Sequence, residues 1–220
     1  MIDAMKEQTV RDKIEQFFAS GATKFYRRGE TIVFAGEEPA GVMLLSDGLI
    51  EQYDITSRGD KLTVNMFRPG VFFPMSWAIT KTPNKYFFSA FSDVTVSVVE
   101  ANAAVRFLHD NSDVTFDLLR RVYIGTDAIL SRLVLAASGV AAERLVFELL
   151  IEAHRFGQMT DSSHALIKVK QTCLAERSGL ARETVGRELH DLADDGLITV
   201  TRQGIMLSLD KLSSRLGVAV

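Results

Sequence analysis

The feature that most constrains the fold is a pair of short helical patterns separated by a glycine, within residues 169–198. Thr172 can cap a first helix that runs through Ser178, and Gly179 can supply a left-handed turn. A second helix then runs from Ala181 to about Asp194. Two short helices around such a turn form a helix-turn-helix, whose second helix enters the major groove of DNA by its N-terminal end.

Apolar residues and a following hairpin extend this prediction. Residues 199–207 have the pattern of a β-hairpin with the turn Arg202-Gln203-Gly204 at its tip, in the position of a wing. We therefore predict a winged helix-turn-helix domain over residues 139–220. The residues expected to be buried between its two helices are Leu174, Ala175, Leu180, Val185 and Leu189.

The local charge favours a nucleic-acid partner, although the whole chain has a formal net charge of -3. Arginines lie at the start of the second helix and carboxylates lie further along it, whereas the helix dipole favours the opposite order. DNA phosphates near the start of the helix would explain the arginines; a solvated charged surface is the alternative. Between residues 167 and 187 the basic residues are Lys168, Lys170, Arg177, Arg182 and Arg187, and the acidic residues are Glu176 and Glu183.

A long helical pattern begins at Ser112, which can serve as its N-cap, and continues to about Ala137. A helix that packs only on its own domain could show a single apolar stripe, but Leu118, Leu130 and Val134 form a second one. We therefore predict that residues 112–138 form the dimerisation helix of a homodimer. Its seam has the alternating spacing of three and four of a two-helix coiled coil, at Leu119, Val122, Thr126, Ile129, Leu133 and Ala136.

Two further segments complete the expected organisation. The run Ala137-Ser-Gly-Val140 interrupts the long helix and predicts a hinge, and an amphipathic helix is expected from Ala141 to His154. From Ala22 to about Glu100 no helix-length pattern separates the predicted strands, which favours an antiparallel barrel or roll. The fold class is thus α+β, with a β-roll sensor domain and flanking helices over residues 1–111. The strands are expected at 31–34, 42–45, 49–56, 62–67 and 94–99.

Composition excludes several other classes of protein. The longest apolar run, 124–140, is interrupted by Asp127 and Arg132, so no membrane span is expected. The N-terminus is charged from its third residue, which does not fit a signal peptide, and a cytoplasmic location is expected. The single cysteine, Cys173, excludes an intramolecular disulfide and a cysteine-rich metal site. The four histidines lack metal-ligand spacing and no nucleophile motif is present, so we expect no enzyme, metal or cofactor.

The segment Arg182-Glu-Thr-Val-Gly-Arg187 resembles the recognition helix of the cyclic-AMP receptor protein / fumarate–nitrate regulator (Crp/Fnr) family of transcriptional regulators. The resemblance covers nearly the whole chain. In the predicted roll, the residues that match the glycine landmarks of the family are Gly29-Glu30, Gly36-Glu37, 43–48 and Pro69-Gly70.

The resemblance implies a DNA site and a role for each residue that contacts it. Arg182 would pair with a guanine, Glu183 would accept from a cytosine amino group, and Arg187 would reach guanine or phosphate, which agrees with the chemistry of the base edges. It also implies an inverted repeat of double-stranded DNA with half-sites like TGTGA, and RNA polymerase as a protein partner. The remaining residues of the predicted interface are Lys170, Thr172 and Thr184, which would contact phosphates, Gln171, and Arg202 in the wing.

The chain departs from the family pattern at two positions of this interface. Ala181 stands where serine or threonine is common, which weakens the helix N-cap by about 1 kcal/mol and puts one phosphate contact in doubt. Gln171 replaces an arginine that reads DNA in the cyclic-AMP receptor protein, so preference at one base pair is expected to be relaxed.

The sensor domain departs further from the family members that bind cyclic nucleotides. Those members hold the ribose with a glycine–glutamate pair and the phosphate with an arginine–serine pair. Here Pro74 and Met75 occupy the first pair of positions, and Asn84 and Lys85 lie near the second. We therefore expect that cyclic AMP does not control this chain. The candidate effector pocket comprises Pro74, Met75, Trp77, Asn84, Lys85, Tyr86, Thr126, Ile129 and Leu130.

The nature of any effector stays open at this point. Aromatic residues between Phe72 and Phe88 predict a filled or apolar pocket, although aromatics at strand spacing are more often plain core. The alternative is a regulator that responds to a cyclic nucleotide or to haem through a non-standard pocket, with His109 as the only histidine of the sensor domain. Oxidation of Cys173 could disturb DNA binding, but a packing role is the favoured interpretation.

Overall fold

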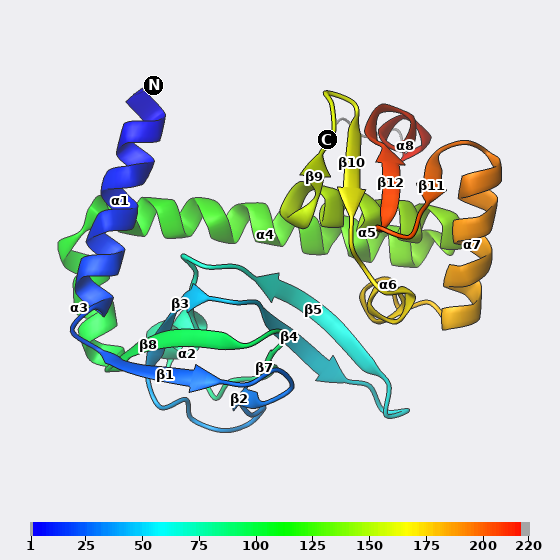
Figure 1. The fold of residues 1–220 in the computed structure, drawn as a ribbon. Coiled ribbons are helices and arrows are strands. Elements are labelled where there is room, and N and C mark those ends of the chain that lie inside the picture. The colour runs from blue at the N-terminus through cyan, green and yellow to red at the C-terminus, as the bar shows by residue number, and fades with distance from the viewer. Residues whose placement is uncertain (1, 217–220) are drawn as a thin grey trace. The chain divides into compact units, whose positions relative to one another are not determined.

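The computed structural model describes residues 2–216 and divides into two compact units at Thr126/Asp127. The division falls within one long helix, α4 (Ser112–Ser138), so each unit contains part of it (Figure 1). The long helix was predicted from 112 to about 137, and its existence and length are confirmed.

The first unit contains a roll of eight strands in two antiparallel sheets, as predicted. One sheet has the order β1-β8-β3-β6 and the other has the order β2-β7-β4-β5. The five predicted strands are all present, but β1, β6, β7 and the short helix α2 were not predicted. The bounds are β1 Ala22–Tyr26, β2 Thr31–Val33, β3 Val42–Asp47, β4 Ile50–Ile55, β5 Lys61–Phe67, β6 Phe72–Phe73, α2 Met75–Thr80, β7 Phe87–Ala90 and β8 Val94–Val99.

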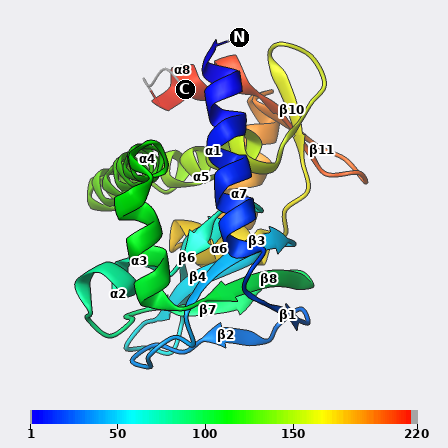
Figure 2. The ribbon, with the colours of Figure 1, turned by 90° about the vertical axis from the view of Figure 1, so that its left-hand side faces the viewer.

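Strand β3 shows how the roll buries both of its surfaces. Successive side chains of a strand point to opposite faces. Met43 and Leu45 pack in the interior of the roll with residues of β4, β7 and β8, while Val42 and Leu44 pack against helices. These helices are α1 (Ile2–Phe18), α2, α3 (Ala101–Asp110) and the start of α4 (Figure 2). The continuous apolar run of β3 therefore serves two separate cores.

Helix α4 is packed at its start and exposed along most of its length. Val114 is its buried residue, and Leu118 packs on the same helical core. Leu130 and Val134 are 51% and 68% exposed, so the second apolar stripe packs on the chain's own core only at Leu118. The predicted cap is also displaced: Ser112 lies inside the helix, and the carbonyl of Asn111 accepts the first bond, from the Thr115 N–H at 3.1 Å.

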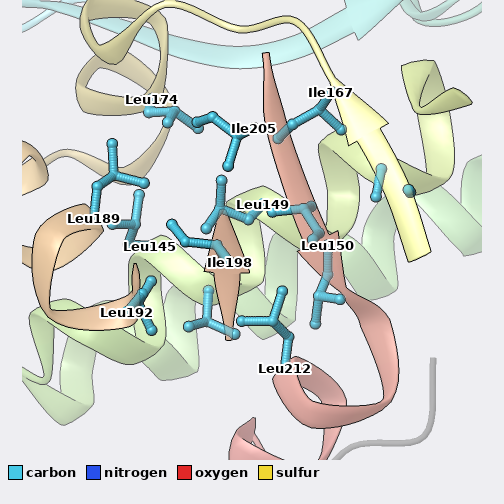
Figure 3. Packing of buried hydrophobic residues seen from close by; sticks show 14 of the residues in the cluster. Leu145, Leu149, Leu150, Ile167, Leu174, Leu189, Leu192, Ile198, Ile205 and Leu212 are labelled. Atoms are coloured by element: carbon cyan, nitrogen blue, oxygen red, sulfur yellow. The ribbon is translucent and has the colours of Figure 1, made fainter. Parts of the chain in front are cut away.

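The second unit packs helices α5 to α8 around a four-stranded sheet of order β11-β12-β10-β9. Its core is aliphatic: side chains from α5 meet those from β10, β11, β12 and the other three helices (Figure 3). α4 ends at Ser138 and the next helix begins at Ala141, so the predicted break is confirmed. The bounds are α5 Ala141–Phe156, β9 Gln158–Met159, β10 His164–Ile167, α6 Gln171–Ser178, α7 Arg182–Asp194, β11 Ile198–Val200, β12 Ile205–Ser208 and α8 Leu209–Leu216.

Candidate nucleic-acid interface

The turn between α6 and α7 is the predicted left-handed one. Gly179 has φ 63° and ψ 28°, and its N–H donates to the Ala175 carbonyl at 2.9 Å. A side chain at this position would strain the backbone, because L-residues rarely adopt positive φ. Ala181 then returns to an extended conformation (φ -64°, ψ 146°) and its carbonyl accepts from the Val185 N–H at 3.0 Å. The chain thus leaves α6 and starts α7 within three residues.

Burial orients α7 so that its opposite face is free. Leu174 of α6 is buried together with Val185 and Leu189 of α7, while Ala175 and Leu180 pack at the edge of the same core. All five are predicted positions: burial is confirmed for Leu174, Val185 and Leu189, whereas Ala175 and Leu180 are half-buried. At about 1.5–3 kcal/mol for each fully buried large apolar side chain, this contact fixes the pair of helices against each other.

The polar residues at the start of α7 are exposed. Arg182, Glu183 and Arg187 are exposed, and Thr184 is half-buried. Arg187 lies 3.8 Å from the carboxylate of Glu188, while Arg182 and Glu183 form no ion pair with the residues that the structure describes. The arginine fork and the carboxylate at this end of the helix can therefore form hydrogen bonds to another molecule.

Neither helix of the pair begins with a side-chain cap. Ala181 is the N-cap of α7 and Lys170 is the N-cap of α6, and neither makes a side-chain cap hydrogen bond. The prediction that Thr172 caps α6 is wrong, because the helix begins at Gln171 and Thr172 lies in its first turn. Uncapped N–H groups and the positive end of the dipole favour an anion such as a phosphate at these helix starts.

Gln171 lies close to Gly186, in the middle of α7. Its side-chain oxygen is 3.7 Å from the place that a Cβ on Gly186 would occupy. Lys170, Gln171 and Thr172 are all exposed. The fold therefore brings the start of α6 close to the middle of α7, and the polar residues of both helices share one region of the surface.

The predicted wing is a hairpin of β11 and β12. Thr201 closes it: its N–H donates to the Gly204 carbonyl at 2.8 Å, and its hydroxyl accepts from the Gly204 N–H at 3.2 Å. Arg202 and Gln203 are exposed at the tip. Gly204 has φ 151°, and a Cβ there would lie 2.2 Å from the Ile167 carbonyl oxygen. The role of Thr201 was not predicted, although a threonine before a glycine turn is a known turn signal.

One basic residue of the predicted positive segment does not belong to this surface. Arg177 is 8% exposed and forms an ion pair with Glu152, which is 5% exposed. The exposed basic residues of this region are Lys168, Lys170, Arg182, Arg187 and Arg202. No local sequence signal could have revealed the pair, because its members are 25 residues apart.

The candidate effector residues are mostly occupied by contacts within the first unit. Met75 is buried and Trp77 packs beside it against the helical core, while Tyr86 packs against the interior of the roll. Asn84 is buried, and its side-chain amide donates to the carbonyls of Phe34 and Tyr86. Of the remaining residues, Pro74 is buried, Lys85 and Thr126 are exposed, and Ile129 and Leu130 are exposed in the second unit.

Aromatic rings fill part of the interior of the roll. Phe73 and Phe88 stack with their centroids 5.2 Å apart, and Phe67 stacks on both at 5.9 and 5.8 Å. These contacts place Phe67, Phe73 and Phe88 in the core of this unit. Of the two expectations from the sequence, a filled pocket and an apolar pocket, they favour the filled one.

The described part of the chain was also searched for metal-binding groups and for membrane-spanning helices. Within residues 2–216, no group of three or more histidine, cysteine, aspartate or glutamate side chains could hold a metal ion. Over the same residues, no helix is both long and apolar enough to cross a membrane. Cys173 is a free, half-buried thiol.

Comparisons with known proteins agree with both parts of this description. Residues 23–111 match the cyclic nucleotide-binding domain, and residues 143–215 match the Crp-like helix-turn-helix domain. The global nitrogen regulator of Synechocystis sp. is 25% identical over 186 residues, which cover 82% of this chain and 81% of that protein. A CRP-family transcriptional regulator from Thermus thermophilus has a similar structure, with a TM-score of 0.70, 25% identity and coverage of 89% of this chain and 97% of that one. A second regulator from the same organism, of the CRP/FNR family, gives a TM-score of 0.71 at 22% identity and covers 89% of this chain and 98% of its own.

Proposed function

The chain belongs to the Crp/Fnr family of DNA-binding transcriptional regulators, and on that premise we propose that it acts as a homodimer on an inverted DNA repeat. The observation that carries the proposal is the exposed pair Arg182 and Glu183 at the uncapped start of α7. This end of a recognition helix is the part that meets base edges in the major groove.

The proposed contacts follow from the chemistry of each exposed side chain. Arg182 donates both arms of its guanidinium to a guanine, and Glu183 accepts from the amino group of a cytosine. Arg187 reaches guanine or phosphate from one turn further along α7. Gln171 contacts a base edge beside Gly186, and the residues that bind phosphates are Lys170, Thr172, Thr184 and, from the wing, Arg202.

The proposed dimer contact is the exposed seam of α4. A row of exposed apolar side chains this long is costly on the surface of a monomer, and its spacing suits a parallel two-helix coiled coil. A two-fold dimer would present two copies of α7 to two half-sites about one helical turn apart. The seam residues are Leu119, Val122, Thr126, Ile129, Leu133 and Ala136, of which Leu119, Val122, Ile129 and Leu133 are 46–64% exposed.

The proposed regulator does not use cyclic AMP as its effector. The residues at the anchoring positions are Pro74, Met75 and Asn84, and the amide of Asn84 is already bonded to two carbonyls. Phe67, Phe73 and Phe88 stack inside the roll. Lys85 is the basic residue near the phosphate position, and it lacks the fork of an arginine.

The wider role is that of a regulator without catalytic activity. A regulator of transcription acts through RNA polymerase, which is therefore the proposed protein partner, and the cytoplasm of a bacterial cell is the proposed location. Whether the chain activates or represses transcription depends on where its sites lie relative to promoters.

The test is DNA selection combined with one seam variant. Purified protein is expected to select an inverted repeat with half-sites like TGTGA from random DNA, and to sediment as a dimer at micromolar concentration. Leu133→Asp places a charge in the seam and should give monomers that lose the repeat. Ser131→Asp, at an exposed position away from the seam, is the matched control. A wild-type monomer, or selection of sites without an inverted repeat, would contradict the proposal.

A further inference from the structure

An ion pair joins the two helices on either side of the break at 139–140. Arg132, near the end of α4, donates from Nε to Oε1 of Glu148 at 2.5 Å and from Nη2 to Oε2 at 3.0 Å. Glu148 lies on α5 and is 2% exposed. The two parallel bonds give the contact a fixed geometry as well as energy.

The same face of α5 is also joined to the helix-turn-helix, since Arg144, Glu148 and Glu152 follow one another at intervals of four residues. Glu152, one turn after Glu148, pairs with the buried Arg177 of α6. Arg144 donates from Nε to the carbonyl of Ser178 at 3.0 Å, at the last residue of α6 before the turn. Helix α5 is therefore linked to α4 through one carboxylate and to α6 through a second carboxylate and an arginine.

Covalent connection alone does not fix the angle between α4 and α5. The link consists of Gly139 and Val140, both exposed, and α5 begins without a side-chain cap. Separation of Arg132 from Glu148 would leave a buried carboxylate without its partner, which is strongly unfavourable. The ion pair thus holds the two helices at one angle across a link that is flexible by itself.

We propose that Arg132 is a positioning residue for DNA binding, which sets the direction of the helix-turn-helix relative to the dimerisation helix through Glu148. The inference rests on the proposed homodimer. When two helix-turn-helix domains extend from a pair of α4 helices, the angle between each domain and its α4 fixes the spacing of the half-sites that the dimer can bind at once. Loss of the pair then relaxes the spacing requirement, whereas a merely stabilising role would weaken binding to every spacing alike.

The test compares DNA probes that differ only in spacing. Arg132→Gln combined with Glu148→Gln removes both charges, keeps the side chains similar in size and leaves no lone buried charge. The control is Arg121→Gln with Asp117→Asn, which removes the ion pairs of Asp117 with Arg121 at 2.7 Å and with Arg120 at 3.0 Å, neither of which spans the break. Three probes are needed: the selected repeat, the repeat with one inserted base pair, and a single half-site.

One inserted base pair rotates a half-site by about a tenth of a turn, so we expect it to weaken binding by wild type and control about tenfold. Binding by the double variant should weaken less than about threefold, because its helix-turn-helix is no longer held at one angle. Affinity for the single half-site should be the same for all three proteins. Arg132→Lys keeps the charge without the fork, and it should give an intermediate penalty even if the double variant is too unstable to measure. Equal insertion penalties in wild type and variants would overturn the inference. Failure of the proposed function would differ, since wild type itself would not prefer the repeat.

Discussion

The two predicted sites of this chain differ in how far their residues are exposed and in how many contacts these residues already make. The residues expected to bind DNA, such as Arg182, Glu183 and Lys170, are exposed around the starts of two uncapped helices. Of the nine residues expected to line an effector pocket, three are buried and two are half-buried within the first unit, and Met75 and Asn84 among them already have partners there. A polar group on the surface can still bind a ligand, but a buried side chain whose bonds are satisfied must first give them up.

This contrast separates two effects of mutation. In the DNA reader, which is the exposed polar surface of α6, α7 and the wing, loss of a side chain that contacts DNA should change affinity for DNA and leave the free energy of unfolding nearly unchanged. In the roll, loss of a buried side chain should lower the free energy of unfolding and leave DNA contacts intact. The expected effects decrease from the core of the roll to the surface of the reader.

The largest effect is expected at the aromatic stack of the roll. Phe88→Ala removes a ring that stacks on Phe67 and Phe73, and we expect it to lower the free energy of unfolding by about 3–5 kcal/mol. Denaturation followed by fluorescence of the single tryptophan, Trp77, reports on this unit. Phe25→Ala, at a ring that is 59% exposed, is the control and should change little. A stable Phe88→Ala protein would break the contrast.

The next effect is expected at the start of α7. Arg182→Ala should weaken binding to the matched site by about 1–3 kcal/mol and remove discrimination at one guanine, without a change in thermal stability. Lys170→Ala is the matched control: it should weaken binding to matched and random DNA alike and make the salt dependence shallower by about one unit. Titrations of single-base variants at several salt concentrations measure both. Unchanged base preference in Arg182→Ala would refute the docking of α7.

A smaller and favourable effect is expected at Ala181. A serine can accept a hydrogen bond from an N–H of the first turn of α7, so Ala181→Ser should stabilise this helix by about 1 kcal/mol. Hydrogen exchange of the amides of residues 183–185 measures the gain directly. Ala137→Ser, at an exposed position near the end of α4, should give no such gain. If exchange at 183–185 were as fast in Ala181→Ser as in wild type, the start of α7 would not be limited by its missing cap.

No effect is expected from cyclic AMP. At physiological concentrations it should neither release heat in calorimetry nor change affinity for the inverted repeat, because the anchoring positions hold Pro74, Met75 and Asn84. Tight, saturable binding would contradict the contrast between the two sites and would point to Lys85 as the partner of the phosphate.

The DNA reader could be predicted from sequence because its signals are local. Helical periodicity identified Leu174, Val185 and Leu189 as buried, which left Arg182 and Glu183 on the opposite face. Gly179 marked the turn. The starts of two helices were predicted less accurately. Helix α4 begins at Ser112 itself and α6 begins at Gln171, so both proposed caps, Ser112 and Thr172, lie inside their helices.

The missed features depend on contacts between distant parts of the chain. Strand β6 has only two residues and α2 only six, which is too short for a periodic pattern. The aromatic run that includes Phe87 and Phe88 suggested a pocket rather than the strand β7. Arg132 and Arg177 form ion pairs with residues that are 16 and 25 positions away in the sequence. An arginine in a sequence gives no sign of which distant carboxylate it will meet in the fold.

The glycine in the turn of the wing has a consequence for how this surface can change during evolution. A side chain at Gly204 would collide with the Ile167 carbonyl of β10, so this position accepts essentially no replacement. Arg202 and Gln203, two and one residues earlier, are exposed, so other side chains fit there without a change in the fold. Natural selection can therefore alter which part of the DNA the wing touches, and how strongly, while the wing itself stays in place.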